Sequence, residues 1–248
     1  MKLSVQLYSV RDQCAADFAG TLRALRSMGL RHVELAGLHG RTPEEARRIL
    51  NGEGLSVSAS HVGFERLESD LPAVVAENAA LGNDFVVVPW IDKEFYSDGW
   101  GPCARRFEPV ARALKRAGMR FGYHNHDFEL AMENGKPGLQ VLFEAADPEL
   151  VYAQIDTYWV YYGGQDPAAF VRGLAGRVPQ VHLKDGHDGD IPRDAEPGSG
   201  ALDWDSILAA CNESEVEMGA IEYDDAPRDP LESVRASVEF FRAKGIED

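Results

Sequence analysis

Seven side chains that can bind a metal or move a proton stand at or just beyond the ends of short apolar runs. They are His61, His124, His126 and His182 together with Glu34, Asp156 and Glu222. Imidazoles and carboxylates form a mixed nitrogen and oxygen ligand set, which suits Mn²⁺, Co²⁺, Fe²⁺ or Zn²⁺ better than Ca²⁺. Imidazole also titrates near neutral pH and can carry protons. These residue types predict metal-assisted acid–base chemistry if the fold brings them together.

Eight apolar, β-prone runs recur along the chain at intervals typical of strand–helix units. We expect strands over residues 3–7, 32–35, 55–59, 85–88, 119–123, 151–155, 180–183 and 218–221. Most of these runs alternate little between polar and apolar residues, as expected of parallel strands covered by helices. The pattern therefore predicts eight parallel strands.

The segments between these runs carry helix start and stop signals. Thr42 is followed by Pro43 and by Glu45, which is the pattern of an N-cap, a first-turn proline and a capping box. Glycines follow several helical patterns and are expected to end them, at Gly29, Gly82, Gly118 and Gly245. Strands therefore alternate with helices along the whole chain.

Eight such alternations without a linker predict a single-domain (β/α)₈ TIM barrel over residues 1–248. A doubly wound open sheet is the main competitor, but open sheets usually have fewer strands, and the glycine pattern of a dinucleotide fold is missing after the first strand. Two long connections, 90–103 and 185–201, follow predicted strands. We expect both on the catalytic face of the barrel, where long loops form walls and lids.

The charge balance indicates which kinds of partner are unfavourable. The chain has 25 Lys and Arg against 41 Asp and Glu, a formal net charge of −16, which disfavours a nucleic-acid partner. No run approaches the roughly 18 apolar residues of a membrane span, and no signal peptide is recognisable. Cys14, Cys103 and Cys211 are widely spaced, which favours free thiols and a cytoplasmic location.

Strand parity selects the side chains that point toward the barrel axis. Gly122, Gln154, Lys184 and Ala220 should point inward. One set of polar side chains at the strand ends should point inward as well. That set is His124, Asp156, His182 and Glu222, from four consecutive strands. Mutual hydrogen bonding is the alternative, but a bound cation better resolves the cost of so many buried charges.

Other residues around the same mouth are candidates for substrate contact. They are Gln6, Glu34, His61, Trp90 and Lys184. Lys184 could also stabilise the charge of an enolate. Gln6 and Glu34 are equally compatible with hydrogen bonding at the barrel floor.

Five segments occur in order on the predicted strands and loops: VQLYSVRD at 5–12, GYHNHDFE at 122–129, DTYW at 156–159, VHLKD at 181–185 and GSGALDW at 198–204. Together they resemble the sugar phosphate isomerase/epimerase group of the xylose-isomerase-like TIM barrels. The resemblance covers almost the whole chain. It implies a metal held by Glu, Asp, His and Glu from strands five to eight. Asp156, His182 and Glu222 match the last three, whereas His124, or His126 near it, stands in place of the first Glu.

The resemblance implies an isomerase or epimerase of a small polyhydroxylated substrate, either a sugar, a sugar phosphate or an inositol derivative. The metal would stabilise an enediolate after Glu222, His124 or His126 removes the proton beside the carbonyl. Because a histidine replaces one glutamate, a dehydratase or lyase of keto-inositols or keto-sugars is the alternative. A non-catalytic sugar-binding barrel is a third hypothesis, and an abasic-site endonuclease is disfavoured by the acidic charge. A homo-oligomer is compatible with the sequence.

Overall fold

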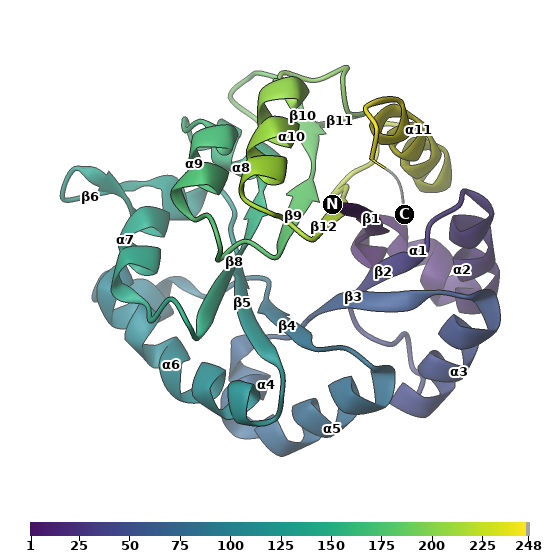
Figure 1. Ribbon diagram of the computed structural model, residues 1–248, viewed down its shortest axis with the longest axis horizontal. Helices are drawn as coiled ribbons and strands as arrows, with labels where there is room; N and C mark the ends of the chain where they lie inside the picture. The colour runs from purple at the N-terminus through teal and green to yellow at the C-terminus, as the bar shows by residue number, and fades with distance from the viewer. Residues whose placement is uncertain (247–248) are drawn as a thin grey trace.

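Eight short parallel strands surround a central axis in the computed structural model, which describes residues 1–246 (Figure 1). They are β1 (Lys2–Val5), β2 (His32–Leu35), β3 (Ser56–His61), β4 (Phe85–Val88), β5 (Arg120–His124), β8 (Val151–Asp156), β9 (Gln180–Leu183) and β12 (Met218–Ile221). Their order in the sheet is β1-β12-β9-β8-β5-β4-β3-β2. The predicted eight-stranded TIM barrel is confirmed.

The first and last neighbours in this order meet at the ends of β1 and β2. An isolated parallel bridge joins Gln6 to Glu34 there, so two polar residues close the barrel. Elsewhere the register places Asp156 beside His182, and His182 beside Ala220. Because side chains alternate along a strand, inward groups from neighbouring strands lie at the same level of the barrel.

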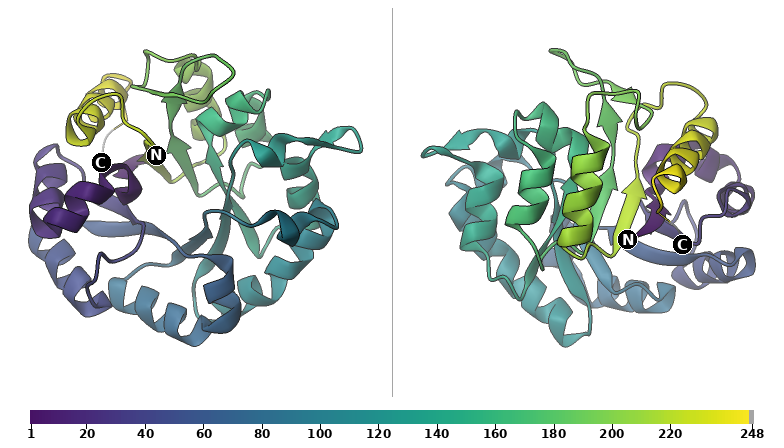
Figure 2. Two further views of the ribbon diagram at one scale, coloured as in Figure 1. Left: turned by 180° about the vertical axis from the view of Figure 1, so that it is seen from behind. Right: turned by 45° about the horizontal axis from the view of Figure 1, so that its top comes forward.

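Helices lie outside the strands over the described residues (Figures 1 and 2). They are α1 (Arg11–Ala16), α2 (Phe18–Ser27), α3 (Pro43–Glu53), α4 (Phe64–Ser69), α5 (Leu71–Leu81), α6 (Trp100–Arg116), α7 (Gly138–Ala145), α8 (Thr157–Tyr162), α9 (Pro167–Gly173), α10 (Trp204–Glu213) and α11 (Pro230–Ala243). The capping box of α3 is confirmed, since Thr42 and Glu45 each accept the other's backbone N–H. Gly82 ends α5 with a positive φ, which a side chain would strain.

Several strand limits differ from the prediction. β1 ends at Val5 because Leu7–Val10 forms a 3₁₀ helix (η1), in which the Tyr8 N–H donates to the Gln6 side chain. β3 and β8 continue to His61 and Asp156, one or two residues beyond the predicted ends. Both extensions carry a polar side chain to the mouth of the barrel.

The two long connections contain structure of their own. The first holds a 3₁₀ helix at Lys93–Tyr96 (η2), and α6 begins at Trp100, inside the predicted loop. The distant Glu133 carboxylate accepts the Trp100 N–H at 3.1 Å, a cap that local sequence cannot reveal. The second holds the antiparallel pair β10 (Asp185–Gly186) and β11 (Asp194–Ala195). This segment stands out beyond the end of β9 (Figure 2).

Short pieces also follow β5. Phe128–Leu130 forms a 3₁₀ helix (η3), and β6 (Met132–Glu133) pairs with β7 (Lys136–Pro137) as a small hairpin that leads into α7. The Glu133 carboxylate that caps α6 belongs to this hairpin. The connection after β5 thus supports the helix after β4.

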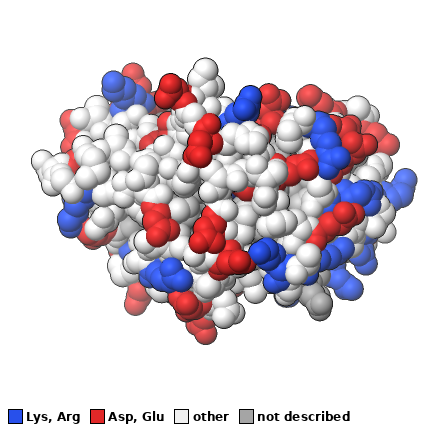
Figure 3. Space-filling view, turned by 90° about the horizontal axis from the view of Figure 1, so that it is seen from above, with Lys and Arg blue, Asp and Glu red and all other residues white. Residues whose placement is uncertain are grey.

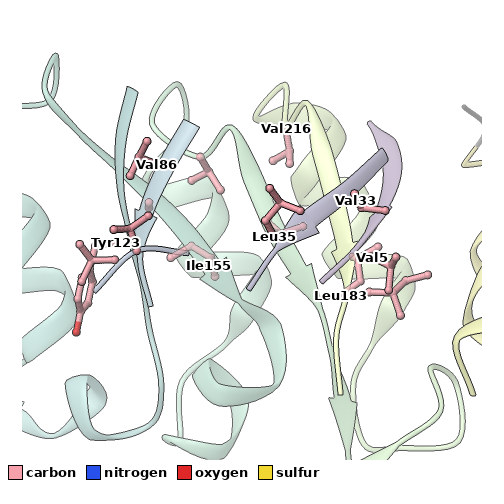
Figure 4. Close-up of a cluster of buried hydrophobic side chains, with 14 of the residues drawn as sticks. Val5, Val33, Leu35, Val86, Tyr123, Ile155, Leu183 and Val216 are labelled. Atoms are coloured by element: carbon pink, nitrogen blue, oxygen red, sulfur yellow. The ribbon is translucent and has the colours of Figure 1, made fainter. Parts of the chain in front are cut away.

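Apolar strand residues face the helices and form the main core, including Val5, Leu35, Val86, Ile155 and Leu183 (Figure 4). On β5, the rings of Phe121 and Tyr123 lie 5.3 and 5.4 Å from that of Phe107 in α6. Phe121 and Tyr123 thus point outward, in agreement with the predicted inward direction of Gly122 between them. The residues that alternate with them on this strand therefore point into the barrel interior.

The outer surface carries mixed charge. Acidic and basic side chains lie interspersed over the face seen from above (Figure 3). Cys14, Cys103 and Cys211 are buried free thiols. No helix within residues 1–246 has the length and apolar character needed to cross a bilayer.

Candidate metal centre

Four side chains converge at the C-terminal ends of β5, β8, β9 and β12. They are His124, Asp156, His182 and Glu222, and one donor atom from each lies within 4.8 Å of the others. All four side chains are buried. This is the set selected by strand parity, so the fold brings the predicted ligands into one cluster.

Two atoms of this cluster have no partner among the described residues. His124 Nδ1 and Asp156 Oδ2 are buried without a hydrogen bond. Such orphaned polar atoms are costly, and a cation bound in this cluster would satisfy those that it contacts. Two imidazoles and two carboxylates also match the ligand preference of divalent transition metals. The residues present therefore fit a divalent metal.

His182 lies between two carboxylates. Its Nδ1 is 2.8 Å from Glu222 Oε2, and its Nε2 is 2.9 Å from Glu34 Oε2. Burial lowers the pKa of His182, but the charges and hydrogen bonds of Glu222 and Glu34 outweigh it and hold the pKa well above its usual value. Glu34 is outside the four-residue cluster. With Nε2–H donated to Glu34, a metal would bind at Nδ1, beside Glu222, in place of the proton on that nitrogen.

Glu34 lies beneath this cluster and contacts most of the polar side chains in that layer. It is fully buried and accepts hydrogen bonds from Gln154 and Gln180 as well as from His182. His61 Nε2 also lies 2.8 Å from Glu34 Oε1. Although burial raises it, the charges of His182 and His61 hold the pKa of Glu34 well below its usual range. Glu34 is thus a permanent buried anion that orients two imidazoles.

Gln6 occupies the same layer. Its Nε2 lies 3.3 Å from His61 Nδ1, and its side chain is fully buried. Neither Gln6 nor Glu34 lines the mouth, whereas His61 does. Substrate contact by Gln6 and Glu34 stays a prediction, and their observed contacts are those of the barrel-floor alternative.

A cavity of about 360 Å³ opens above the cluster. It is lined by Tyr8, Ala36, His61, Pro89, Trp90, His124, His126, Glu222 and Asp224. Trp90 is 50% exposed and Tyr8 43%, so both rings are available to a ligand. Hollows of about 620 and 650 Å³ lie outside the barrel, along α8–α10 and between α7 and α9, but none of the predicted site residues lines them.

His126 reaches this cavity from the loop after β5. Burial lowers its pKa to about 4, so the imidazole is neutral at pH 7 and able to accept a proton. Its backbone N–H donates to Glu129 at 2.9 Å, and the same carboxyl accepts from the Tyr123 hydroxyl at 2.7 Å. Burial raises the pKa of Glu129 to about 8. Glu129 was missed from the sequence, although it stands within the segment 122–129.

Lys184 points inward as predicted but does not line the cavity. It is fully buried and forms an ion pair with Asp224. Its Nζ also lies 3.8 Å from both Asp194 and Glu222. Burial lowers its pKa, but these carboxylates outweigh it and raise the pKa above its usual value. Asp224 was missed, although its place two residues after Glu222 gives it the same strand parity.

The chain is similar to known proteins in sequence and in fold. A family model, Xylose isomerase-like TIM barrel, matches residues 22–244. The inosose dehydratase of Clostridium tetani (strain Massachusetts / E88) is 26% identical over 161 residues, which is 56% of this chain and 52% of that protein. The chain therefore spans about half the length of this curated relative.

Solved structures show the same fold. A sugar phosphate isomerase/epimerase from Parabacteroides distasonis ATCC 8503 has a TM-score of 0.85 and 21% identity, with 97% of both chains covered. A probable 3-DHS dehydratase from Bacillus anthracis has a TM-score of 0.77 and 15% identity, with 98% of this chain and 99% of that chain covered. At such identities the likeness concerns the fold alone.

Proposed function

Because this chain belongs to the Xylose isomerase-like TIM barrel family, we propose that it is a metal-dependent enzyme that removes the proton beside a carbonyl of a small polyhydroxylated substrate. The observation that carries the proposal is the four-residue cluster with its two orphaned atoms, His124 Nδ1 and Asp156 Oδ2. The adjoining cavity holds groups that can accept a proton, His126 and Glu222.

A divalent metal held by His124, Asp156, His182 and Glu222 would supply a Lewis acid that polarises the carbonyl of the substrate. The chain's own residues would do the rest. Trp90 would cover one face of the substrate, since this residue lines the cavity and is 50% exposed. Burial raises the pKa of Glu222, but the charges of His182 and Lys184 outweigh it, so this carboxylate stays ionised and can accept a proton.

The first candidate reaction is isomerisation or epimerisation, in which the proton is returned to a carbon of the substrate. Glu222 follows β12 and His126 follows β5, three positions apart around the barrel. Both line the cavity, so the two groups can approach a bound substrate from different sides. One would remove the proton, and the same group or the other would return it.

The second candidate is elimination of a hydroxyl group, as in a dehydratase. The favouring observation is that a histidine stands at the strand-five position and that burial keeps His126 neutral. A neutral imidazole accepts a proton more readily than it donates one, which makes the acid–base set unequal. The similarity to an inosose dehydratase supports the same alternative.

Metal content is the direct test of the site. Asp156→Asn and His182→Ala should each lose the bound metal and the turnover, as measured by elemental analysis of the purified proteins. His187→Ala is the matched control, because His187 lines an outer hollow and should leave metal content unchanged. Unchanged metal content in Asp156→Asn would show that the assignment of the metal site is wrong.

Products distinguish the two reactions. Keto-inositols and keto-sugars would be incubated with the loaded enzyme in deuterated water. Deuterium beside the carbonyl without loss of water supports isomerisation or epimerisation, whereas a conjugated product that absorbs in the ultraviolet supports elimination. Stabilisation by a ligand with neither change would instead indicate a non-catalytic sugar-binding barrel.

A further inference from the structure

The loops after the seventh and eighth strands are the usual place of phosphate binding in TIM barrels, where backbone N–H groups hold the anion. In this chain those loops follow β9 and β12. Their N–H groups therefore bear directly on whether the site proposed above can take a phosphorylated substrate.

The loop after β12 already holds an anion of the protein itself. Asp194 Oδ2 accepts the backbone N–H groups of Asp224 and Asp225 at 2.6 and 3.0 Å. Asp194 is buried and comes from β11, in the loop after β9. Its carboxylate thus occupies the two amides that would otherwise be available to a phosphate.

The loop after β9 is filled in the same way. Asp185 is buried, and its carboxylate accepts the backbone N–H groups of Gly186, Gly198 and Leu202 at 2.9, 3.0 and 3.4 Å. It also accepts the Trp204 indole N–H at 2.8 Å. In both loops, internal aspartates therefore occupy backbone N–H groups that could otherwise bind an anion.

The charged side chains near the mouth also disfavour a phosphate. No Lys or Arg is among the described residues that line the cavity, whereas Glu222 and Asp224 are. The buried Lys184 is already surrounded by Asp224, Asp194 and Glu222. A phosphate entering here would meet the carboxylates of Glu222 and Asp224 without a Lys or Arg side chain free to pair with it.

Arg11 is another cation near this wall. Its two terminal nitrogens donate to the carbonyl oxygens of Tyr8 and Asp224 at 2.9 and 3.1 Å. Its guanidinium lies over the Tyr8 ring, 4.3 Å from the centroid. Arg11 therefore supports the rim of the cavity instead of offering a free charge to a ligand.

From these contacts we propose that the site takes an unphosphorylated, uncharged polyhydroxy ketone and discriminates against its phosphate esters. The inference rests on the proposed function only for the location of the site. The apolar side chains of Trp90, Pro89 and Ala36 would cover the carbon face of the substrate, and the polar side of the cavity would bind its hydroxyl groups.

Matched ligand pairs test the proposal by calorimetry, which needs no turnover. The pairs are myo-inositol with myo-inositol 1-phosphate, and D-fructose with D-fructose 6-phosphate, each titrated into the 248-residue chain with and without Mn²⁺. We expect each ester to bind about tenfold or more weakly than its partner. An ester that binds as tightly as its partner, or more tightly, overturns the proposal.

A variant decides the matter even if no member of either pair binds the wild-type protein. Asp194→Ala frees the N–H groups of residues 224 and 225 and should raise the affinity for both esters about tenfold or more. Asp194→Asn keeps an acceptor oxygen while removing the charge, and should raise it less. Asp190→Ala, which removes an exposed carboxylate of the same loop, should change nothing.

Unchanged ester affinity in a folded Asp194→Ala protein overturns the proposal, as does an equal rise in Asp190→Ala. Thermal melting establishes that each variant is folded, and Asp194→Asn serves if Asp194→Ala is not. Failure of the proposed function has a different signature, namely no bound metal and no exchange of substrate protons in the wild-type protein.

Discussion

Replacing Glu34 by glutamine tests whether this carboxylate of the barrel floor orients His182 for metal binding at the candidate metal centre. The exchange keeps the shape of the side chain and removes the charge that faces His182 Nε2 at 2.9 Å. One oxygen of the new amide can still accept, but its NH₂ group cannot. Donors from His182, His61, Gln154 and Gln180 converge on the two carboxylate oxygens, so at least one donor will face the NH₂ group.

The magnitude follows from the role of the carboxylate behind a metal-binding histidine. Loss of such a partner typically costs 10- to 100-fold in metal affinity, or about 1.4 to 2.7 kcal/mol. We expect the upper end because Glu34 is fully buried. In the metal-free protein, removing one partner of this buried ion pair should also cost about 3 to 5 kcal/mol of unfolding free energy.

The assay is calorimetric titration of Mn²⁺ or Zn²⁺ into the metal-free wild type and Glu34→Gln. Urea unfolding with and without metal separates the loss of folding from the loss of binding. Nitrogen chemical shifts of His182 report its protonation and should change in the metal-free variant. Glu129→Gln is the control, because Glu129 is also a buried carboxyl but contacts Tyr123 and His126, outside the cluster.

Unchanged metal affinity together with unchanged His182 shifts in Glu34→Gln would refute this reasoning. Equal losses of affinity in Glu34→Gln and Glu129→Gln would refute it as well, because the effect would then be a general response to a lost buried carboxyl.

Three further outcomes are expected. Burial raises the pKa of Glu129 to about 8 from 4.5, so the folded state holds an extra proton and stability falls as pH rises from about 4.5 to about 8. Urea unfolding across this range should show that Glu129→Gln removes on the order of 4 kcal/mol of this fall; equal slopes would contradict it. Asp185→Asn should cost about 2 to 4 kcal/mol in the same assay, because this carboxylate accepts four N–H groups, and a cost under about 0.5 kcal/mol would count against it. Gly122→Ala should cost about 1 to 3 kcal/mol, because its Cβ would lie 2.6 Å from the Phe85 ring; a wild-type melting temperature would contradict the packing.

Much of the fold was predictable from the sequence because it depends on local patterns. Apolar runs predicted the eight strands, and strand parity placed Asp156 and His182 toward the axis. The capping box at Thr42 was readable for the same reason, since its two partners stand three residues apart. The convergence of the four candidate ligands needed only one added premise, that the ends of parallel strands in a closed barrel surround one mouth.

Tertiary structure alone decided what the surrounding polar groups do. Glu34 meets His182 across 148 residues, and Asp194 reaches the N–H of Asp224 across 30. No local pattern specifies such pairs, because they depend on the inward direction of each strand and on the path of the loops. The sequence by itself therefore determined that the four candidate ligands, His124, Asp156, His182 and Glu222, gather at the strand ends. The three-dimensional contacts decided that Glu34 orients the candidate metal ligand His182 and that internal aspartates occupy backbone amides of the loops after β9 and β12.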